Sequence, residues 1–286
     1  MSPHPSCALA RSETATVPAA SATQRFATGT QFEMRPLSGG WGAELLGFEI
    51  TGSPSPEVVR ALREALLEHS LLLLRGQALP PARHIRFARV FGAHVHRCTP
   101  TFAVLPAFPE IFRVSNRGTQ GHPDRCYWHS DGAYLEDRTA ITVQHIVTPS
   151  DRGDTLYANT TRVYDHLSPS QRARLDCLRT RAQTTGVVHS LVQRHPHTGR
   201  TGLYVNLHPR AVIVDAEGRE QPDVEDLLRD RLTAGSYRHR WRRGDVVMVD
   251  ELAVAGCGTP ADPRSLRVLH RVTVPGHAVP RHCAAR

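Results

Sequence analysis

Short apolar segments of strand length recur along most of this chain, and they constrain its fold more than any other feature. From Phe32 onward, apolar runs of about four to eight residues are separated by turn signals rich in Gly, Pro, Ser and Asp. Helix signals are few, and strands and helices do not alternate regularly. This pattern favours a mostly β fold of the α+β type, with two sheets and peripheral helices. The strand-like segments are 34–37, 43–48, 71–74, 111–114, 140–147, 155–158, 203–206, 211–214, 237–241, 246–249 and 267–274.

The expected helices begin where a capping residue precedes a proline. Ser55-Pro56-Glu57 combines an N-cap hydroxyl, a proline at the first helical position and a carboxylate near the positive end of the helix dipole. A helix is therefore expected to run from there to about His69. Ser168-Pro169 repeats the signal. The run Leu71 to Leu74 has the length of a strand and suits one buried on both faces. Further helices are expected over 81–91 and 224–232.

Length and composition indicate one folded domain after a leader. Residues 1–31 are rich in Ser, Thr, Ala and Pro and predict a disordered leader, whereas 32–286 predict a single domain. The net charge is +8 and the pI about 9.7, but the arginines are scattered through the chain. With aromatic residues at 6%, no stacking platform for nucleic acid is expected. The charge permits nucleic-acid or anionic-substrate partners and selects neither, whereas the few aromatic residues favour no nucleic-acid partner; a homo-oligomer is left open.

The cysteines and apolar runs bear on the cellular compartment. The six cysteines show no paired C-x-x-C spacing, which favours neither a zinc knuckle nor a disulfide framework. No apolar run approaches the length of a bilayer span, and the first thirty residues lack a continuous apolar stretch typical of a signal peptide. We therefore expect a cytoplasmic protein that does not associate with membranes.

Two pairs of side chains suggest a metal beside an anion clamp. In an extended backbone, residues two apart lie on one face, so His129 and Asp131 can aim an imidazole and a carboxylate at a single metal ion. By the same rule, Arg267 and Arg271 share a face of the late strand and can present two cations to a carboxylate-bearing ligand.

An H-x-D triplet is weak evidence by itself, because the chain contains a second one at His122-Pro123-Asp124. Spacing alone does not separate the two. The triplet at His129 is favoured because Trp128 precedes it and the small Gly132 follows it, whereas Pro123 makes the other triplet typical of a turn.

From about Met34 to Gly276 the chain resembles the taurine dioxygenase (TauD/TfdA) family of non-haem Fe(II) and 2-oxoglutarate-dependent oxygenases. The resemblance implies the double-stranded β-helix, or jelly-roll, core of that family, with peripheral helices. It also implies an oxidoreductase of the dioxygenase class that binds iron. The matching stretches are 75–80 (RGQALP), 87–92 (FARVFG), 128–131 (WHSD), 153–157 (GDTLY), 164–168 (YDHLS), 195–199 (HPHTG), 203–206 (LYVN), 240–248 (RWRRGDVVM) and 269–273 (LHRVT).

The resemblance assigns roles to individual residues. His129 and Asp131 match the first two ligands of a facial triad on Fe(II), which leaves open positions for 2-oxoglutarate and O2. Thr155 and Arg267 match residues that bind 2-oxoglutarate. Two further residues match positions that contact the substrate in the taurine enzyme, Arg271 and, in a looser alignment, His96.

The chain departs from the family pattern at the third ligand, where Gly256 replaces a histidine. Glu251 and Leu252 also stand where the family usually has Asn and Arg. Three outcomes are open. Iron is held by two protein ligands and 2-oxoglutarate, with a water, a halide or a substrate atom in the remaining position; a neighbouring group such as the Cys257 thiolate replaces the histidine; or the site no longer uses iron.

The resulting hypothesis is an Fe(II)/2-oxoglutarate oxygenase-like enzyme with an incomplete triad that acts on a small, anionic or amino-acid-like molecule in secondary metabolism. In the family, 2-oxoglutarate is oxidatively decarboxylated to succinate and hydrogen is removed from a substrate carbon, with hydroxylation as the default outcome. Two alternatives remain: a metal-independent cyclase, lyase or isomerase on the same fold, and a catalytically silent ligand-binding protein.

Overall fold

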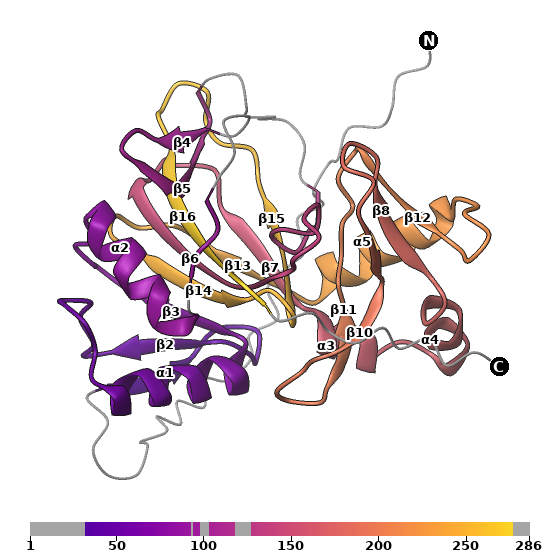
Figure 1. Cartoon of the computed structure of the whole chain (residues 1–286), viewed down its shortest axis with the longest axis horizontal. Coiled ribbons are helices and arrows are strands. Elements are labelled where there is room, and N and C mark those ends of the chain that lie inside the picture. Colours follow the sequence, from indigo (N-terminus) through magenta and orange to yellow (C-terminus); the bar gives the residue numbers. More distant parts are fainter. Residues whose placement is uncertain (1–31, 93, 98–102, 118–126, 277–286) are drawn as a thin grey trace, which may run out of the picture.

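A computed structural model describes residues 32–92, 94–97, 103–117 and 127–276 of the chain (Figure 1). Its largest element is an eight-stranded sheet. The expected leader over 1–31 and the second triplet at 122–124 lie outside the described residues. The strands of this sheet are, in spatial order, β1 (Glu33–Pro36), β2 (Ala43–Leu46), β3 (Leu71–Leu74), β14 (Val246–Asp250), β6 (Thr139–Thr148), β16 (Val268–Pro275), β5 (Phe108–Ser115) and β4 (Val104–Leu105).

Two helices cover one face of this sheet. They are α1 (Pro56–His69) and α2 (Pro81–Ala88), and α2 continues into a 3-10 turn over Arg89–Phe91. The predicted start of α1 is confirmed, since the Ser55 side chain accepts a hydrogen bond from the Val58 backbone N–H. Figure 1 shows both helices on the side of the molecule opposite α4 (Pro169–Leu175) and α5 (Pro222–Ala234).

A smaller sheet faces the larger one and contains two of the predicted site positions, Thr155 and Gly256. Its three strands are β13 (Ser236–His239), β7 (Thr155–Asn159) and β15 (Val254–Gly258). The two sheets enclose an apolar layer that includes Leu71, Tyr157 and Trp241. The prediction that 71–74 is buried on both faces is confirmed, because Leu72 and Leu74 pack instead into the layer beneath α1 and α2. The mostly β jelly-roll core with peripheral helices is likewise confirmed.

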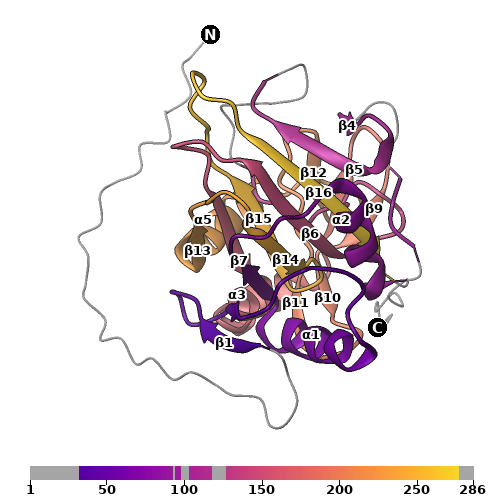
Figure 2. The same cartoon turned by 90° about the vertical axis from the view of Figure 1, so that its left-hand side faces the viewer.

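A third layer packs behind the smaller sheet and closes the far side of the core (Figure 2). The side chains that join the two include Ala255 and Cys257 of β15 and Leu228 of α5. Besides α4 and α5, this layer contains α3 (Thr160–Asp165), β8 (Arg179–Ala182), β9 (Val188–Ser190), β10 (Val192–Arg194), β11 (Thr201–Leu203) and β12 (Ala211–Val214).

The structure corrects two local expectations. The strand expected over 203–206 is wrong for most of its length, because β11 ends at Leu203, although Asn206 forms an isolated bridge with His129. The strand β15 was not expected, because Gly256 and Gly258 weaken the strand signal of this segment.

No helix among the described residues is long and apolar enough to cross a membrane.

Candidate active site

A cavity of about 990 Å³ lies between the two sheets. Its wall brings together residues that are far apart in the sequence. They come from the H-x-D segment, from β7 and β15 of the smaller sheet, and from β16 and the residue just before it. The predicted site positions that line it are His129, Asp131, Thr155, Gly256, Arg267 and Arg271. His96 is not among the lining residues; its backbone N–H and its Nδ1 contact Thr273 instead, at 2.9 and 3.2 Å.

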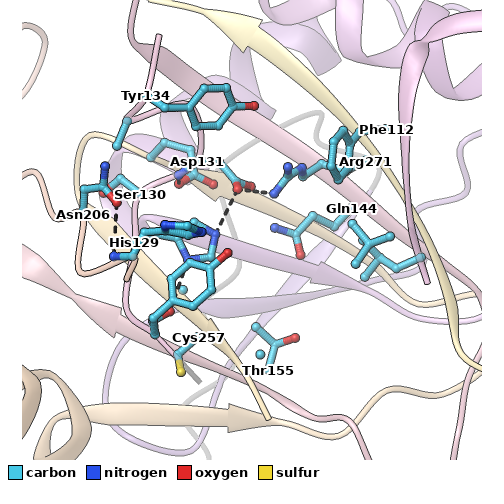
Figure 3. A pocket seen from close by; sticks show the side chains of 18 of the residues that line it. Phe112, His129, Ser130, Asp131, Tyr134, Gln144, Thr155, Asn206, Cys257 and Arg271 are labelled. Carbon is cyan, nitrogen blue, oxygen red and sulfur yellow. Dashed lines mark hydrogen bonds and ion pairs between the residues drawn. The ribbon is translucent and has the colours of Figure 1, made fainter. Parts of the chain in front are cut away.

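His129 pairs with Gly256 of β15 through a single antiparallel bridge at the edge of the smaller sheet. Its backbone N–H donates to the Gly256 carbonyl at 3.0 Å, and the Gly256 N–H donates back at 2.8 Å. The ring Nδ1 lies 3.2 Å from the Tyr127 carbonyl, so Nδ1 is the protonated nitrogen and donates there. This hydrogen bond leaves the lone pair of Nε2 facing the cavity, the tautomer that a metal ligand requires (Figure 3).

Asp131 is buried, with 5% of its surface exposed. Its Oδ1 lies 3.4 Å from His129 Nε2 and also accepts a hydrogen bond from Arg271 Nη1 (Figure 3). Burial opposes ionisation of this carboxyl, but the positive charge of the neighbouring Arg271 lowers its pKa below the ordinary value. Asp131 is therefore a carboxylate whose negative charge is already shared with a cation.

Arg271 lies between Asp131 and an aromatic ring. Its guanidinium carbon is 4.6 Å from the centre of the Phe112 ring, and its side chain is 14% exposed. Burial opposes its charge, but the neighbouring Asp131 carboxylate keeps its pKa raised. Arg271 Nε is buried and has no hydrogen-bond partner within the described residues.

A second carboxyl, Glu251, lies directly behind Asp131. Its Oε2 accepts the Asp131 backbone N–H at 2.7 Å, and its Oε1 accepts the Thr142 hydroxyl at 2.5 Å. Burial and the Asp131 charge raise the pKa of Glu251 well above its ordinary value. From the sequence, Glu251 was only a departure from the family pattern without a role.

The third ligand position is spacious. A Cβ atom built on Gly256 would meet nothing closer than the Tyr157 ring at 3.9 Å and the His129 carbonyl at 4.0 Å. Across the described residues, no group of three or more His, Cys, Asp or Glu side chains is placed to hold a metal ion. The donor set is thus His129 and Asp131 alone, which fits a two-ligand site and does not fit a complete triad.

The idea that the Cys257 thiolate replaces the histidine is wrong. Cys257 is disulfide-bonded, so its sulfur is not free to ligate a metal. Its side chain packs into the apolar layer behind the smaller sheet, as expected for a neighbour of Gly256 on an alternating strand. The sequence indicated no disulfide framework, and this bond was not predicted because the cysteines show no paired C-x-x-C spacing.

At the other end of the cavity, Thr155, Arg267 and Trp241 lie together; we call this group the anion clamp, after the ligand that the sequence predicts for it. Trp241 Nε1 donates to Thr155 Oγ1 at 2.9 Å, so the Thr155 hydroxyl proton remains available for a ligand. Arg267 Nε donates to the Gly153 carbonyl at 2.9 Å, and its guanidinium carbon lies 5.9 Å from the centre of the Trp241 ring. Burial lowers the pKa of Arg267.

Gly153 is required for this geometry. Its φ is +93°, a conformation that other residues rarely adopt, and a Cβ there would lie 2.8 Å from Arg267 Cδ. Within the described residues Arg267 has no carboxylate within salt-bridge distance. Its Nη groups therefore remain available for an anion from solution.

Three lining or supporting residues were not predicted to act at the site. Tyr157 donates from its hydroxyl to Gln144 Oε1 at 2.8 Å, and both line the cavity beside Gly256 and Arg271. The only signal for Trp241 was its position within the family-like stretch 240–248.

Comparison with known proteins decides the family. The sequence profile described as taurine catabolism dioxygenase TauD, TfdA family matches residues 33–273. The chain belongs to this family. Membership confirms the recognition from sequence and the expectation of an enzyme of the 2-oxoglutarate-dependent dioxygenase class.

Individual members of the TauD, TfdA family are similar over most of their length. The pentalenolactone F synthase of Streptomyces arenae is 27% identical, covering 84% of this chain and 94% of that protein. The alpha-ketoglutarate-dependent sulfate ester dioxygenase of Pseudomonas putida is 26% identical, covering 86% of this chain and 90% of that protein. The crystal structure of a taurine dioxygenase from Burkholderia xenovorans superposes with a TM-score of 0.75 at 30% identity, covering 87% and 91% of the two chains.

Proposed function

We propose that this protein is a 2-oxoglutarate-dependent oxygenase that oxidises a small molecule, by default through hydroxylation. The observation that carries the proposal is the anion clamp. Arg267 is a partly buried cation with no carboxylate partner among the described residues, and Thr155 has a hydroxyl proton to spare. A dicarboxylate fits this pair, because a charge-assisted bond to Arg267 and a bond from Thr155 would replace the water lost on binding.

The predicted cofactors are Fe(II) and 2-oxoglutarate, which agrees with the names of relatives such as the sulfate ester dioxygenase. His129 Nε2 and the Asp131 carboxylate would hold the iron, and 2-oxoglutarate would complete part of its coordination. When bound, Fe(II) supplies the activation of O2 that links decarboxylation of 2-oxoglutarate to oxidation of the substrate. The protein fixes both ligands: the Tyr127 carbonyl selects the His129 tautomer, and Arg271 orients Asp131.

The substrate would occupy the end of the cavity near Phe112, Tyr134 and Arg271. The buried Nε–H of Arg271 has no hydrogen-bond partner among the described residues and would donate to an acceptor atom of the substrate. This donor supports the expected anionic or amino-acid-like substrate, although the Asp131 carboxylate already balances part of the Arg271 charge. The similarity to a pentalenolactone F synthase supports a role in secondary metabolism.

The test is anaerobic titration of the metal-free protein with Fe(II) and 2-oxoglutarate, followed by exposure to O2. We expect a visible charge-transfer band from chelated 2-oxoglutarate and formation of succinate once O2 enters. Neither signal should appear with His129→Ala, because only one protein ligand then remains. Absence of both signals in the unmodified protein, with every substrate tried, would refute the proposal.

A second candidate is a metal-independent lyase, cyclase or isomerase that uses the same clamp. The observation that favours it is the donor set, because only two metal-binding side chains converge among the described residues and one of them is paired with Arg271. Turnover that persists after exhaustive chelation would support this candidate, whereas loss of turnover on chelation and recovery with Fe(II) would exclude it.

A further inference from the structure

The backbone of the H-x-D triplet is held at three successive N–H groups. The His129 N–H donates to the Gly256 carbonyl at 3.0 Å, and the Ser130 N–H donates to the Val205 carbonyl at 2.8 Å. The Asp131 N–H is different, since its acceptor is a side chain, Glu251 Oε2, at 2.7 Å. At its backbone, the residue predicted as the second metal ligand is therefore held by one carboxyl group, while Arg271 contacts its side chain.

Glu251 is itself held firmly. It is 3% exposed, and its second oxygen accepts the Thr142 hydroxyl of β6. Its backbone N–H donates to the Ala140 carbonyl at 2.8 Å, which ties the turn between β14 and β15 to the larger sheet. The chain Thr142 to Glu251 to Asp131 thus links the central strand of the larger sheet to the metal end of the cavity.

The consequence follows from the missing third ligand. A complete triad restrains its metal from three directions, whereas here the geometry of two side chains must suffice. Gly132 comes directly after Asp131 with φ +78°, so the backbone turns sharply there, and the Asp131 carboxylate, which Arg271 holds at one oxygen, also needs a restraint at its backbone. A buried acceptor at the Asp131 N–H provides that restraint.

We propose that Glu251 is a positioning residue for the metal site, acting by accepting the Asp131 backbone N–H and thereby fixing the Asp131 carboxylate beside His129 Nε2. This inference rests on the two-ligand metal site of the proposed function. In this role Glu251 does not contact the metal. Its removal should weaken metal binding, whereas its replacement by a neutral hydrogen-bond acceptor of the same shape should leave metal binding nearly unchanged.

The experiment measures binding of Mn(II), a redox-stable substitute for Fe(II), by the loss of the free Mn(II) electron paramagnetic resonance signal. Glu251→Leu should weaken Mn(II) binding about 10–100-fold, the usual range when a partner of a metal ligand is removed. Glu251→Gln should bind within about threefold of the unmodified protein, because its amide oxygen can still accept the Asp131 N–H. Glu64→Leu, on the exposed face of α1, is the matched surface control and should leave binding unchanged.

Thr142→Val gives an independent test if Glu251→Leu does not fold. It removes the hydroxyl that holds Glu251 and should weaken Mn(II) binding by less than Glu251→Leu would. Unchanged Mn(II) affinity in a folded Glu251→Leu or Thr142→Val protein overturns the positioning role while the proposed function stands. Failure of the unmodified protein to bind Mn(II) at all would refute the two-ligand site, and with it both proposals.

Discussion

The two ends of the cavity differ in how their charges are satisfied. At the clamp end, Arg267 is supported by the Gly153 carbonyl and the Trp241 ring, but it has no anionic partner among the described residues. At the metal end, the cation Arg271 is bonded to Asp131, and the ligand position at Gly256 carries no side chain. One end is built to receive an anion, whereas the other is nearly neutral by itself.

This difference bears on how the two ends of the proposed site would tolerate the absence of a third metal ligand. Clamp residues and their supports, including Trp241 and Gly153, form a connected set with donors to spare. The metal end instead depends on its surroundings, namely Glu251 behind Asp131 and the Tyr127 carbonyl behind His129. We infer that binding of 2-oxoglutarate tolerates the loss of the third ligand better than binding of metal does.

The largest effect is expected from removing the clamp cation. Arg267→Met should weaken 2-oxoglutarate binding by about 2–5 kcal/mol, because one carboxylate of the ligand would be buried without its partner. Isothermal titration calorimetry of the metal-free and Mn(II)-loaded proteins measures this loss. Arg60→Met, on the exposed face of α1, is the control with the same charge change. An equal loss of 2-oxoglutarate affinity in both variants, or no loss in Arg267→Met, would contradict the assignment of the anion clamp to this end of the cavity.

The two ends can be compared only at pH values where the protein stays folded. The lower limit of this range depends on two histidines on the opposite face of the larger sheet. His84 of α2 and His145 of β6 are buried between the helix and the sheet with ring centres 6.1 Å apart, and His84 Nε2 donates to the Val143 carbonyl. Burial, reinforced by the neighbouring His270, lowers the pKa of His84 to about 3 and that of His145 to about 4. Both imidazoles are neutral in the folded protein at neutral pH.

The sign of the pH effect follows from these shifts. Between the ordinary histidine pKa, about 6.5, and the lowered values, the unfolded chain binds protons that the folded chain does not. The free energy of unfolding should therefore fall as pH falls below about 6.5, by about 1.4 kcal/mol per pH unit for each histidine that stays neutral. Urea unfolding at intervals from pH 7 to pH 5 measures the slope. His84→Gln keeps a donor for the Val143 carbonyl and should reduce the slope, and an unchanged slope would contradict this assignment.

Local signals predicted much of the fold. The Ser55 cap and the apolar run 71–74 act over a few residues, and both were predicted correctly. The proximity of His129 and Asp131 was predicted because two-residue spacing in an extended chain places them on one face, and His129 Nε2 lies 3.4 Å from Asp131 Oδ1. Sequence reasoning missed the contacts between distant segments, since Trp241 and Thr155 are 86 residues apart and Glu251 and Asp131 are 120 apart. No local pattern links such pairs, and only the pairing of strands brings them together.

The smallest expected effect is also the sharpest test of the metal end. Gly256→His should fold, because the backbone there has an ordinary φ and the added Cβ would meet no atom closer than 3.9 Å. His129 and residue 256 form a directly opposed backbone pair, so a new imidazole at 256 would lie beside the existing ligands. We expect Mn(II) affinity to rise at least about tenfold, since even partners of metal ligands alter affinity by about 10–100-fold. Gly256→Leu adds similar bulk without a donor atom and should not raise it. A gain in both variants, or in neither, would mean that position 256 does not face the metal, and the register that places the missing histidine there would be wrong.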